Sequence, residues 1–220
     1  MSSDRRATRA NYDRLSRWYD LLSGSSERPA RMHGLHMLDV RSGERVLEIG
    51  CGTGEALSVL ASRTGDAGGV FGLDLSGGML RRAESKLRRD ASNVLLVQAE
   101  ALHLPFANDN FDALFLSFTL ELFPAAEMPT LLMECRRVLR PGGRLGIVSL
   151  LQMDKPNWME RAYTWTHHRW PAAIDCRPIA LQGLLMDAGW NISRFEHLSM
   201  WGLEVGCVVA VGTLELKKDP

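Results

Sequence analysis

Short apolar runs alternate with helical segments through the middle of the chain, and this alternation is the feature that most constrains the fold. Strands alternating with helices at this spacing predict right-handed βαβ units on a mostly parallel sheet, with helices on both of its faces. The expected strands are Arg45–Gly50, Gly69–Leu75, Asn93–Ala99, Phe111–Phe118 and Arg144–Leu150. The expected helices around them are Ala7–Leu22, Arg28–Leu38, Glu55–Arg63, Gly78–Arg89 and Glu127–Leu139.

The end of the chain breaks this rhythm. After an expected helix over Pro178–Ala188, the apolar runs Trp190–Met200 and Leu203–Leu216 follow each other with only a short turn between them. Two strands joined so tightly must be antiparallel. The sequence therefore predicts an α/β fold with a seven-stranded, mostly parallel sheet that ends in an antiparallel C-terminal hairpin. That ending is not the pattern of a dinucleotide dehydrogenase.

Composition narrows the class of protein further. The chain has 220 residues, which is ample for one α/β domain and short for two. Because 26 Lys and Arg balance 26 Asp and Glu, no overall charge predicts binding to nucleic acid. The polar start lacks a secretory signal, and no apolar run reaches the length that spans a bilayer. The four scattered cysteines predict reduced thiols without a metal site in a cytoplasmic protein.

Three glycines follow the first expected strand in the stretch RVLEIGCGTGEAL, at positions 50, 52 and 54. Open α/β sheets bind ligands outside the carboxyl ends of their strands, where glycine lets a ligand approach the backbone closely. A dinucleotide fingerprint would need its third glycine at position 55, which is Glu55. The carboxylate of Glu48, just before the turn, would repel a pyrophosphate and favours a ligand that carries a positive charge.

Acids stand at two further strand ends. Asp74 ends the second expected strand, where an acid accepts hydrogen bonds from ribose hydroxyls. Glu100 follows the third strand. Together with Glu48, these acids fit a ligand made of an adenosine and a positively charged tail. S-adenosylmethionine is a phosphate-free nucleoside of this kind.

Five stretches, in order, resemble the successive motifs of class I S-adenosylmethionine-dependent methyltransferases: VLEIGCGTG, GLDLSGGML, QAEALHLPF, FDALFLSFTLELF and RVLRPGGRLGIVSL. The resemblance runs from about Gly43 to Leu150. It implies a Rossmann-like methyltransferase fold, with S-adenosylmethionine as methyl donor and S-adenosylhomocysteine as product. The leading stretch NYDRLSRWYDLLSG is similar to that of ubiquinone/menaquinone C-methyltransferases and bacterial phosphatidylethanolamine N-methyltransferases.

The resemblance also implies a role for single residues around the cofactor. The methionine end is assigned to Glu48, Gly50, Cys51, Gly52 and Gly54. The ribose and adenine are assigned to Asp74, Leu75, Met79, Glu100 and Ala101. The surroundings of the sulfonium are assigned to Ser117 and Phe118, with Tyr19 and Tyr12 closing over the cofactor from the N-terminal helix.

Two departures from the family leave the acceptor open. Many relatives carry a histidine pair after the fourth strand, where this chain has Leu120-Glu121-Leu122. The tail after Leu150 also differs from that of a typical quinone enzyme. The hypotheses for the acceptor are a phospholipid amine and a quinone precursor. A nicotinamide-dependent oxidoreductase and a non-catalytic S-adenosylmethionine-binding module are the alternatives to a methyltransferase.

The division of the chain follows from these interpretations. We expect one domain, with a helical cap over residues 1–40, a cofactor-binding core over 41–150, a substrate lid over 151–176 and a C-terminal helix with two strands over 177–220. The lid carries tryptophans and basic residues that would contact a membrane surface through residues 152–175. Alternatively, the tryptophans simply pack on the domain. His167, His168 and Tyr19 are the candidate catalytic residues, although methyl transfer scarcely requires a base.

Overall fold

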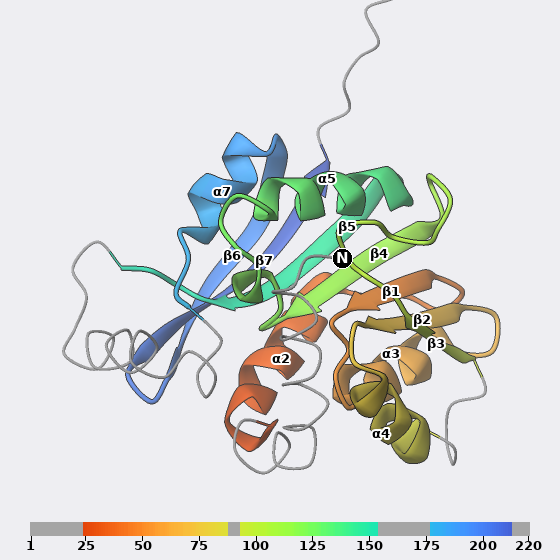
Figure 1. Ribbon diagram of the computed structural model, residues 1–220. Coiled ribbons are helices and arrows are strands. Elements are labelled where there is room, and N and C mark those ends of the chain that lie inside the picture. The colour runs from red at the N-terminus through yellow and green to blue at the C-terminus, as the bar shows by residue number, and fades with distance from the viewer. Residues whose placement is uncertain (1–23, 88–92, 154–176, 213–220) are drawn as a thin grey trace, which may run out of the picture.

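The computed structural model describes residues 24–87, 93–153 and 177–212. Seven strands form one sheet in the order β3-β2-β1-β4-β5-β7-β6 (Figure 1). The strands are β1 (Arg45–Ile49), β2 (Gly69–Asp74), β3 (Val94–Gln98), β4 (Phe111–Ser117), β5 (Leu139–Leu150), β6 (Trp190–Met200) and β7 (Leu203–Gly212). The helices are α2 (Gly24–Leu38), α3 (Glu55–Thr64), α4 (Gly77–Leu87), α5 (Met128–Val138), α7 (Leu181–Asp187) and the 3₁₀ turn η1 (Leu120–Leu122).

The strand order places a topological switch point in the middle of the sheet. Strand β1 pairs in parallel with both β2 and β4, so the chain leaves β1 toward one edge of the sheet and later returns to its other side. Strand β7 pairs antiparallel with β5 and β6. The predicted seven-stranded sheet with an antiparallel C-terminal hairpin is therefore confirmed. Ligands of such sheets bind where the carboxyl ends of β1 and β4 separate.

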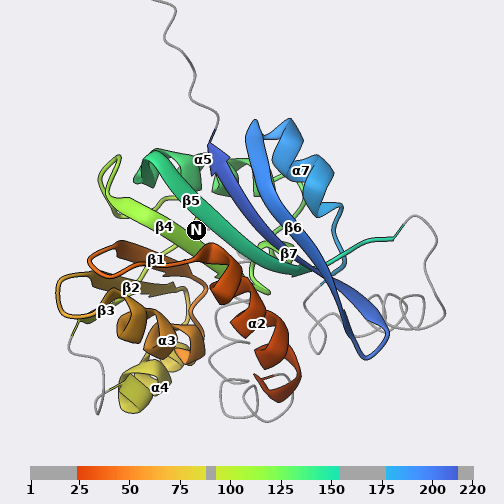
Figure 2. The same ribbon diagram turned by 180° about the vertical axis from the view of Figure 1, so that it is seen from behind.

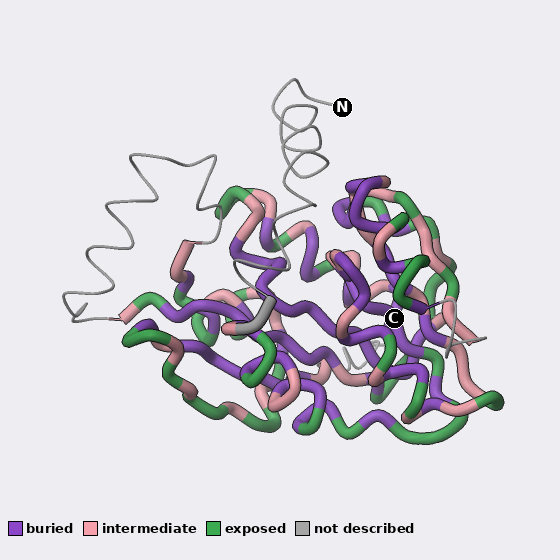
Figure 3. Tube along the Cα trace, turned by 90° about the horizontal axis from the view of Figure 1, so that it is seen from below, coloured by how far each residue is buried: buried purple, intermediate pink, exposed green. Residues whose placement is uncertain are grey.

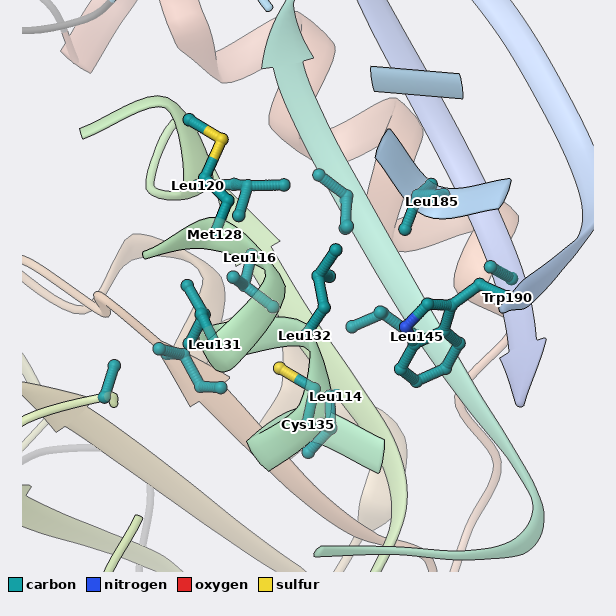
Figure 4. Close-up of a cluster of buried hydrophobic side chains, with 14 of the residues drawn as sticks. Leu114, Leu116, Leu120, Met128, Leu131, Leu132, Cys135, Leu145, Leu185 and Trp190 are labelled. Atoms are coloured by element: carbon teal, nitrogen blue, oxygen red, sulfur yellow. The ribbon is translucent and has the colours of Figure 1, made fainter. Parts of the chain in front are cut away.

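Helices cover both faces of the sheet, as Figures 1 and 2 show. On one face, α5 and α7 bury a cluster of leucines together with Cys135 and Trp190 (Figure 4). On the other face, α2, α3 and α4 bury a second apolar cluster that includes Leu35, Leu57 and Leu80. Strand β4 lies between the two clusters and is buried at every residue, in the buried middle of the molecule seen in Figure 3. A strand covered on both faces requires such a continuous apolar sequence.

The start of β5 differs from the prediction. The sequence Arg140-Pro141-Gly142-Gly143 predicted a turn between a helix and a strand that begins at Arg144. The structure includes it in β5, which begins at Leu139 opposite Phe111, with a register shift before the next pair. Gly142 has a φ of +78° within this irregular stretch, and regular pairing resumes at Arg144, where the predicted strand begins.

The predicted boundaries of most other elements agree within a few residues. Helix α2 begins at Gly24, earlier than the expected Arg28, and contains Pro29. None of the helices in the described ranges is long and apolar enough to cross a membrane.

Candidate cofactor and acceptor site

The three glycines of the turn after β1 are required for two different reasons. All three have positive φ values, +71°, +53° and +82° for Gly50, Gly52 and Gly54. A Cβ atom at Gly50 would lie 2.4 Å from Thr119, and one at Gly54 would lie 3.0 Å from the Ala83 side chain. A Cβ at Gly52 would meet nothing within 4 Å. Packing therefore explains Gly50 and Gly54, whereas Gly52 turns an open backbone face outward, as a ligand cradle requires.

Asp74 is tied to this turn through its side chain. The amide of Gly52 donates to Oδ2 of Asp74 at 2.9 Å, and the amide of Ser76 donates to Oδ1 at 2.8 Å. The hydroxyl of Ser76 accepts from the Met79 amide at 3.2 Å, so Ser76 caps the N-terminus of α4. Each carboxylate oxygen can accept more than one hydrogen bond. The backbone thus fixes Asp74 in place beside the open face of Gly52.

Glu48 is a buried acid beneath the turn. Only 3% of the residue is exposed, and its Oε2 atom has no hydrogen-bond partner among the described residues. Burial raises the pKa of Glu48 to about 8, against the opposing influence of the nearby Arg31 guanidinium. The charges of Asp74 and Glu55 raise this pKa further. A positively charged or hydrogen-donating ligand group would relieve both the unpaired atom and the repulsion.

Arg31 of α2 links three parts of this edge, and sequence reasoning missed it. Its Nε donates to the Ser117 hydroxyl at 3.2 Å, and its two terminal nitrogens donate to Glu55 at 2.7 Å and Glu27 at 2.8 Å. Arg31 is 9% exposed, although nothing in the helix pattern marks a buried arginine. The spacing of Glu27 and Arg31, four residues apart on one helix, was the available signal.

Glu27 is also a buried acid of this edge. Burial raises the pKa of Glu27 to about 7, although the charge and hydrogen bond of Arg31 oppose the shift. The same arginine therefore faces several carboxyl groups at once. The result is a sheet edge with an excess of acidic groups over the guanidinium that α2 supplies.

The end of β4 contributes the remaining part of the site. Ser117 ends the strand and is buried, and the following residue, Phe118, has a φ of +51°. Such a conformation is rare for a bulky side chain and is held here by a hydrogen bond from the Phe118 amide to the Val148 carbonyl, 2.8 Å long. The 3₁₀ turn η1 follows and carries Glu121, which is also buried.

The structure places every described residue of the predicted cofactor set at the carboxyl edge of the sheet. These residues are Glu48, Gly50, Cys51, Gly52, Gly54, Asp74, Leu75, Met79, Glu100, Ala101, Ser117 and Phe118. A direct hydrogen bond connects Gly52 with Asp74. Arg31 bonds to both Ser117 and Glu55, the residue after the glycine turn, and so links these two residues indirectly. The predicted Tyr12, Tyr19, His167 and His168, and residues 154–176 of the expected lid over 151–176, lie outside the described residues.

The described cysteines, Cys51, Cys135 and Cys207, are buried free thiols. Burial raises the pKa of the Cys51 thiol well above its usual value, and the charges of Glu48 and Asp74 act in the same direction. Cys51 therefore packs within the turn and does not serve as a nucleophile. Within the described ranges, no group of His, Cys, Asp or Glu side chains is arranged to hold a metal ion.

Comparison with known proteins gives the class of this chain. Residues 46–143 match a family described as a methyltransferase domain. A demethylmenaquinone methyltransferase of Lactobacillus johnsonii is 33% identical over 148 residues, which are 66% of this chain and 59% of that protein. The corresponding protein of Lactiplantibacillus plantarum is 34% identical over 148 residues, with 66% and 60% covered. The chain thus spans about three fifths of the length of these curated relatives.

Solved structures agree with the fold. An S-adenosylmethionine-dependent methyltransferase from Aquifex aeolicus superimposes with a TM-score of 0.62 at 23% identity, over 82% of this chain and 89% of that one. The 1,6-didemethyltoxoflavin-N1-methyltransferase of Burkholderia thailandensis, solved with 1,6-didemethyltoxoflavin and S-adenosylhomocysteine, gives 0.71 at 18% identity, over 97% and 91%. At these identities the likeness concerns the fold.

Residues 46–143 are thus similar to a methyltransferase domain, and the fold is the Rossmann-like one of solved S-adenosylmethionine-dependent methyltransferases. The predicted resemblance to that class is confirmed. Within the class, the curated relatives described above are named demethylmenaquinone methyltransferases, one of the groups that the leading sequence stretch had indicated.

Proposed function

We propose that this protein is an S-adenosylmethionine-dependent methyltransferase that acts on an aromatic acceptor of the quinol type. The observation that carries the cofactor assignment is the unpaired Oε2 atom of buried Glu48 beside the open backbone of Gly52. A buried acceptor atom without a partner costs about 1–3 kcal/mol, which a ligand donor would offset. The acidic edge suits S-adenosylmethionine because this cofactor carries an ammonium and a sulfonium group.

The residues divide the cofactor among them as the family resemblance implies. Asp74, held by the amides of Gly52 and Ser76, accepts from the ribose hydroxyls. Glu48 and the backbone of the glycine turn hold the methionine end. The adenine lies by Leu75, Met79, Glu100 and Ala101. The methyl group, made electrophilic by its bond to the sulfonium, lies beside Ser117 and Phe118, where the acceptor reaches it.

The two alternatives to a methyltransferase, a nicotinamide-dependent oxidoreductase and a non-catalytic S-adenosylmethionine-binding module, are less well supported. A dinucleotide fingerprint requires glycine at position 55, where the chain has Glu55, and the glycine at 54 packs against Ala83 of α4. A non-catalytic binding module needs no acceptor site, yet η1, just after β4, carries the buried carboxyl group of Glu121, which is not one of the cofactor residues.

The acceptor assignment rests on the names of the relatives. Those proteins are named for demethylmenaquinone, an aromatic quinone, and the match covers about two thirds of this chain. A phospholipid amine remains the competing acceptor from the sequence. Either acceptor is poorly soluble in water, so contact with a membrane surface through residues 152–175 belongs to the same proposal.

The test is transfer of a labelled methyl group from S-adenosylmethionine to a prenylated 1,4-naphthohydroquinone, with phosphatidylethanolamine vesicles as the competing acceptor. We expect labelled quinol, and Glu48→Gln should weaken binding of S-adenosylmethionine in calorimetry roughly tenfold because an amide forms a weaker hydrogen bond to an ammonium. Glu196→Gln, an exposed carboxylate of β6, is the control and should bind normally. Labelled lipid without labelled quinol would reassign the acceptor, and absence of cofactor binding would refute the whole proposal.

A further inference from the structure

Glu121 is a buried carboxylate to which the cofactor assignment gives no role. Only 1% of the residue is exposed. Its Oε1 atom accepts a hydrogen bond from the Leu150 amide at 3.2 Å, whereas its Oε2 atom has no hydrogen-bond partner among the described residues. The Oε1 bond fixes the carboxyl group at the end of β5, and the Oε2 atom without a partner can accept a hydrogen bond from a ligand.

Glu121 follows closely after Ser117 and Phe118, where the proposed function puts the reacting end of the cofactor. It lies in η1, directly after the β4 end that carries Ser117, and its partner Leu150 ends the neighbouring strand β5. The cofactor residues follow the sheet edge from β3 through β2 and β1 to β4. The next position along the same edge is that of Glu121. A second substrate that meets the methyl group at β4 therefore approaches from the side of η1 and β5.

We propose that Glu121 binds the methyl acceptor by accepting a hydrogen bond from its O–H or N–H group and takes up that proton during methyl transfer. This inference rests on the proposed function, which it deepens by naming the group that receives the acceptor. An acceptor with a hydroxyl or amine hydrogen beside the attacking atom is the substrate class that it requires.

Methyl transfer to a hydroxyl or amine acceptor moves one methyl group to the acceptor and one proton away from it. The proton of the O–H or N–H bond passes to Oε2 of Glu121, and its electron pair becomes available to the acceptor, either at that atom or at a conjugated ring carbon. A bond forms from the acceptor to the methyl carbon, while the bond between methyl and sulfur breaks and leaves its electron pair on sulfur. Where the new bond is to a ring carbon, that carbon loses its own hydrogen as a proton and the oxygen regains one, which restores the aromatic hydroquinone. Glu121 then loses its proton to solvent, and one proton is released overall.

The electrostatics of Glu121 agree with this role. Burial raises the pKa of Glu121 to about 8, opposed by hydrogen bonds from the Glu121 and Leu150 amides and from Ser149, while the charge of Glu27 raises it further. A sulfonium beside Ser117 would favour the ionised carboxylate, because an opposite charge nearby lowers such a pKa. A group whose pKa lies near the operating pH is an effective proton acceptor.

Glu121→Gln is the informative variant because glutamine keeps the shape and the oxygen that accepts from Leu150 but cannot take up a proton. The probes are a prenylated 1,4-naphthohydroquinone for the hydroxyl class and phosphatidylethanolamine in vesicles for the amine class. With whichever probe the wild type methylates, we expect kcat to fall at least 100-fold, the lower end of the range for general bases. The dissociation constant of S-adenosylhomocysteine should stay within twofold, as should all parameters of Glu196→Gln.

A binding measurement provides a readout that does not depend on turnover. Calorimetry of each probe with the complex of protein and S-adenosylhomocysteine should show weaker binding to Glu121→Gln than to wild type. Wild-type kcat and probe binding in Glu121→Gln would overturn the proposal while the proposed function stands. Normal cofactor binding without transfer to either probe by the wild type would also overturn it. Failure of the wild type to bind S-adenosylhomocysteine would overturn the proposed function and this inference together.

Discussion

At the edge of the sheet where the parallel strands begin, Glu44 and Asp112 form ion pairs with arginines, whereas at the edge where they end, two of the buried carboxyl groups have an oxygen with neither a hydrogen bond nor an ion pair. Glu44 accepts from both terminal nitrogens of Arg144, at 3.1 and 2.7 Å, and from the Arg41 amide at 3.0 Å. Asp112 accepts from the Arg45 amide at 2.6 Å and forms an ion pair with Arg140. At the opposite edge, Glu48 and Glu121 each have one oxygen without a described partner.

The two edges also differ in how they shift the pKa of their acids. Burial acts to raise the pKa of Glu44, but hydrogen bonds from Arg144 and the Arg41 amide hold it below its ordinary value. Burial raises the pKa of both Glu48 and Glu121 to about 8. The first edge therefore stabilises the fold through its acids, whereas the second keeps acids at a cost to stability. Groups held in that way are typical of ligand sites.

The largest expected effect is on the pH dependence of stability. Between an unfolded pKa of 4.5 and a folded pKa of about 8, Glu48 and Glu121 each bind a proton in the folded state that the unfolded state has lost. The free energy of unfolding must then fall as pH rises through this range. At about 1.4 kcal/mol per pH unit for each proton, the two groups lower it by up to about 3 kcal/mol between pH 6 and pH 7.

Chemical denaturation of the unliganded protein at several pH values measures this slope. A double variant, Glu48→Gln with Glu121→Gln, should flatten it. Glu44→Gln is the matched change at the other edge and should act in the opposite range, because a lowered pKa contributes stability above pH 4.5 that is lost as pH falls. A wild-type protein whose stability rises from pH 6 to pH 7 would contradict the assignment of the two buried acids.

The next largest effect separates two glycines with the same local geometry. Gly52 and Gly43 both have positive φ values, +53° and +84°, and a Cβ atom at either position would meet nothing within 4 Å. Gly43 lies before β1 at the opposite edge. Valine strains both backbones, but only at position 52 does it enter the proposed cofactor cradle. Gly52→Val should weaken binding of S-adenosylhomocysteine in calorimetry more than 100-fold, about 2.7 kcal/mol.

Gly43→Val controls for strain, since it should lose stability without losing affinity for S-adenosylhomocysteine. Circular dichroism would establish that both variants are folded at the temperature of the binding measurement. Equal affinity in Gly52→Val and wild type would leave the glycine turn without a ligand role.

The sequence predicted the features of the site that depend on short stretches of chain. The glycine turn, the acids at strand ends and the hairpin of β6 and β7 each follow from neighbouring residues, and the structure contains all three. The start of β5 at Leu139 was not predicted because it depends on pairing with the distant Phe111, although regular pairing begins at Arg144 as predicted. Short stretches of sequence were therefore enough to predict which edge of the sheet carries the site.

Arg31 and Glu121 could not be predicted because their environment comes from distant parts of the chain. The contact of Arg31 with Ser117 joins residues 86 positions apart, so no helix pattern reveals it. Glu121 was noted only as a departure from the histidine pair of relatives. Its burial arises where η1 meets the end of β5. Burial by distant segments of the chain raises the pKa of an otherwise ordinary acid. No single stretch of sequence reveals that burial.

The smallest expected effect compares two aspartates that each accept backbone hydrogen bonds at opposite edges. Asp74 accepts from the amides of Gly52 and Ser76, and Asp112 accepts from the amide of Arg45. Asp74→Asn keeps one acceptor oxygen and loses the charge-assisted bonds to the ribose hydroxyls. Its affinity for S-adenosylhomocysteine should therefore fall by about 1.5 kcal/mol, roughly tenfold.

Asp112→Asn makes the same chemical change where no ligand is proposed. It weakens the ion pair with Arg140 and should lower the free energy of unfolding without altering the calorimetric affinity. The two variants thus separate a carboxylate that serves the fold from one that serves the cofactor. If both variants bound S-adenosylhomocysteine as the wild type does, Asp74 would only shape the loop between β2 and α4. The ribose would then be held by other groups at the end of β2.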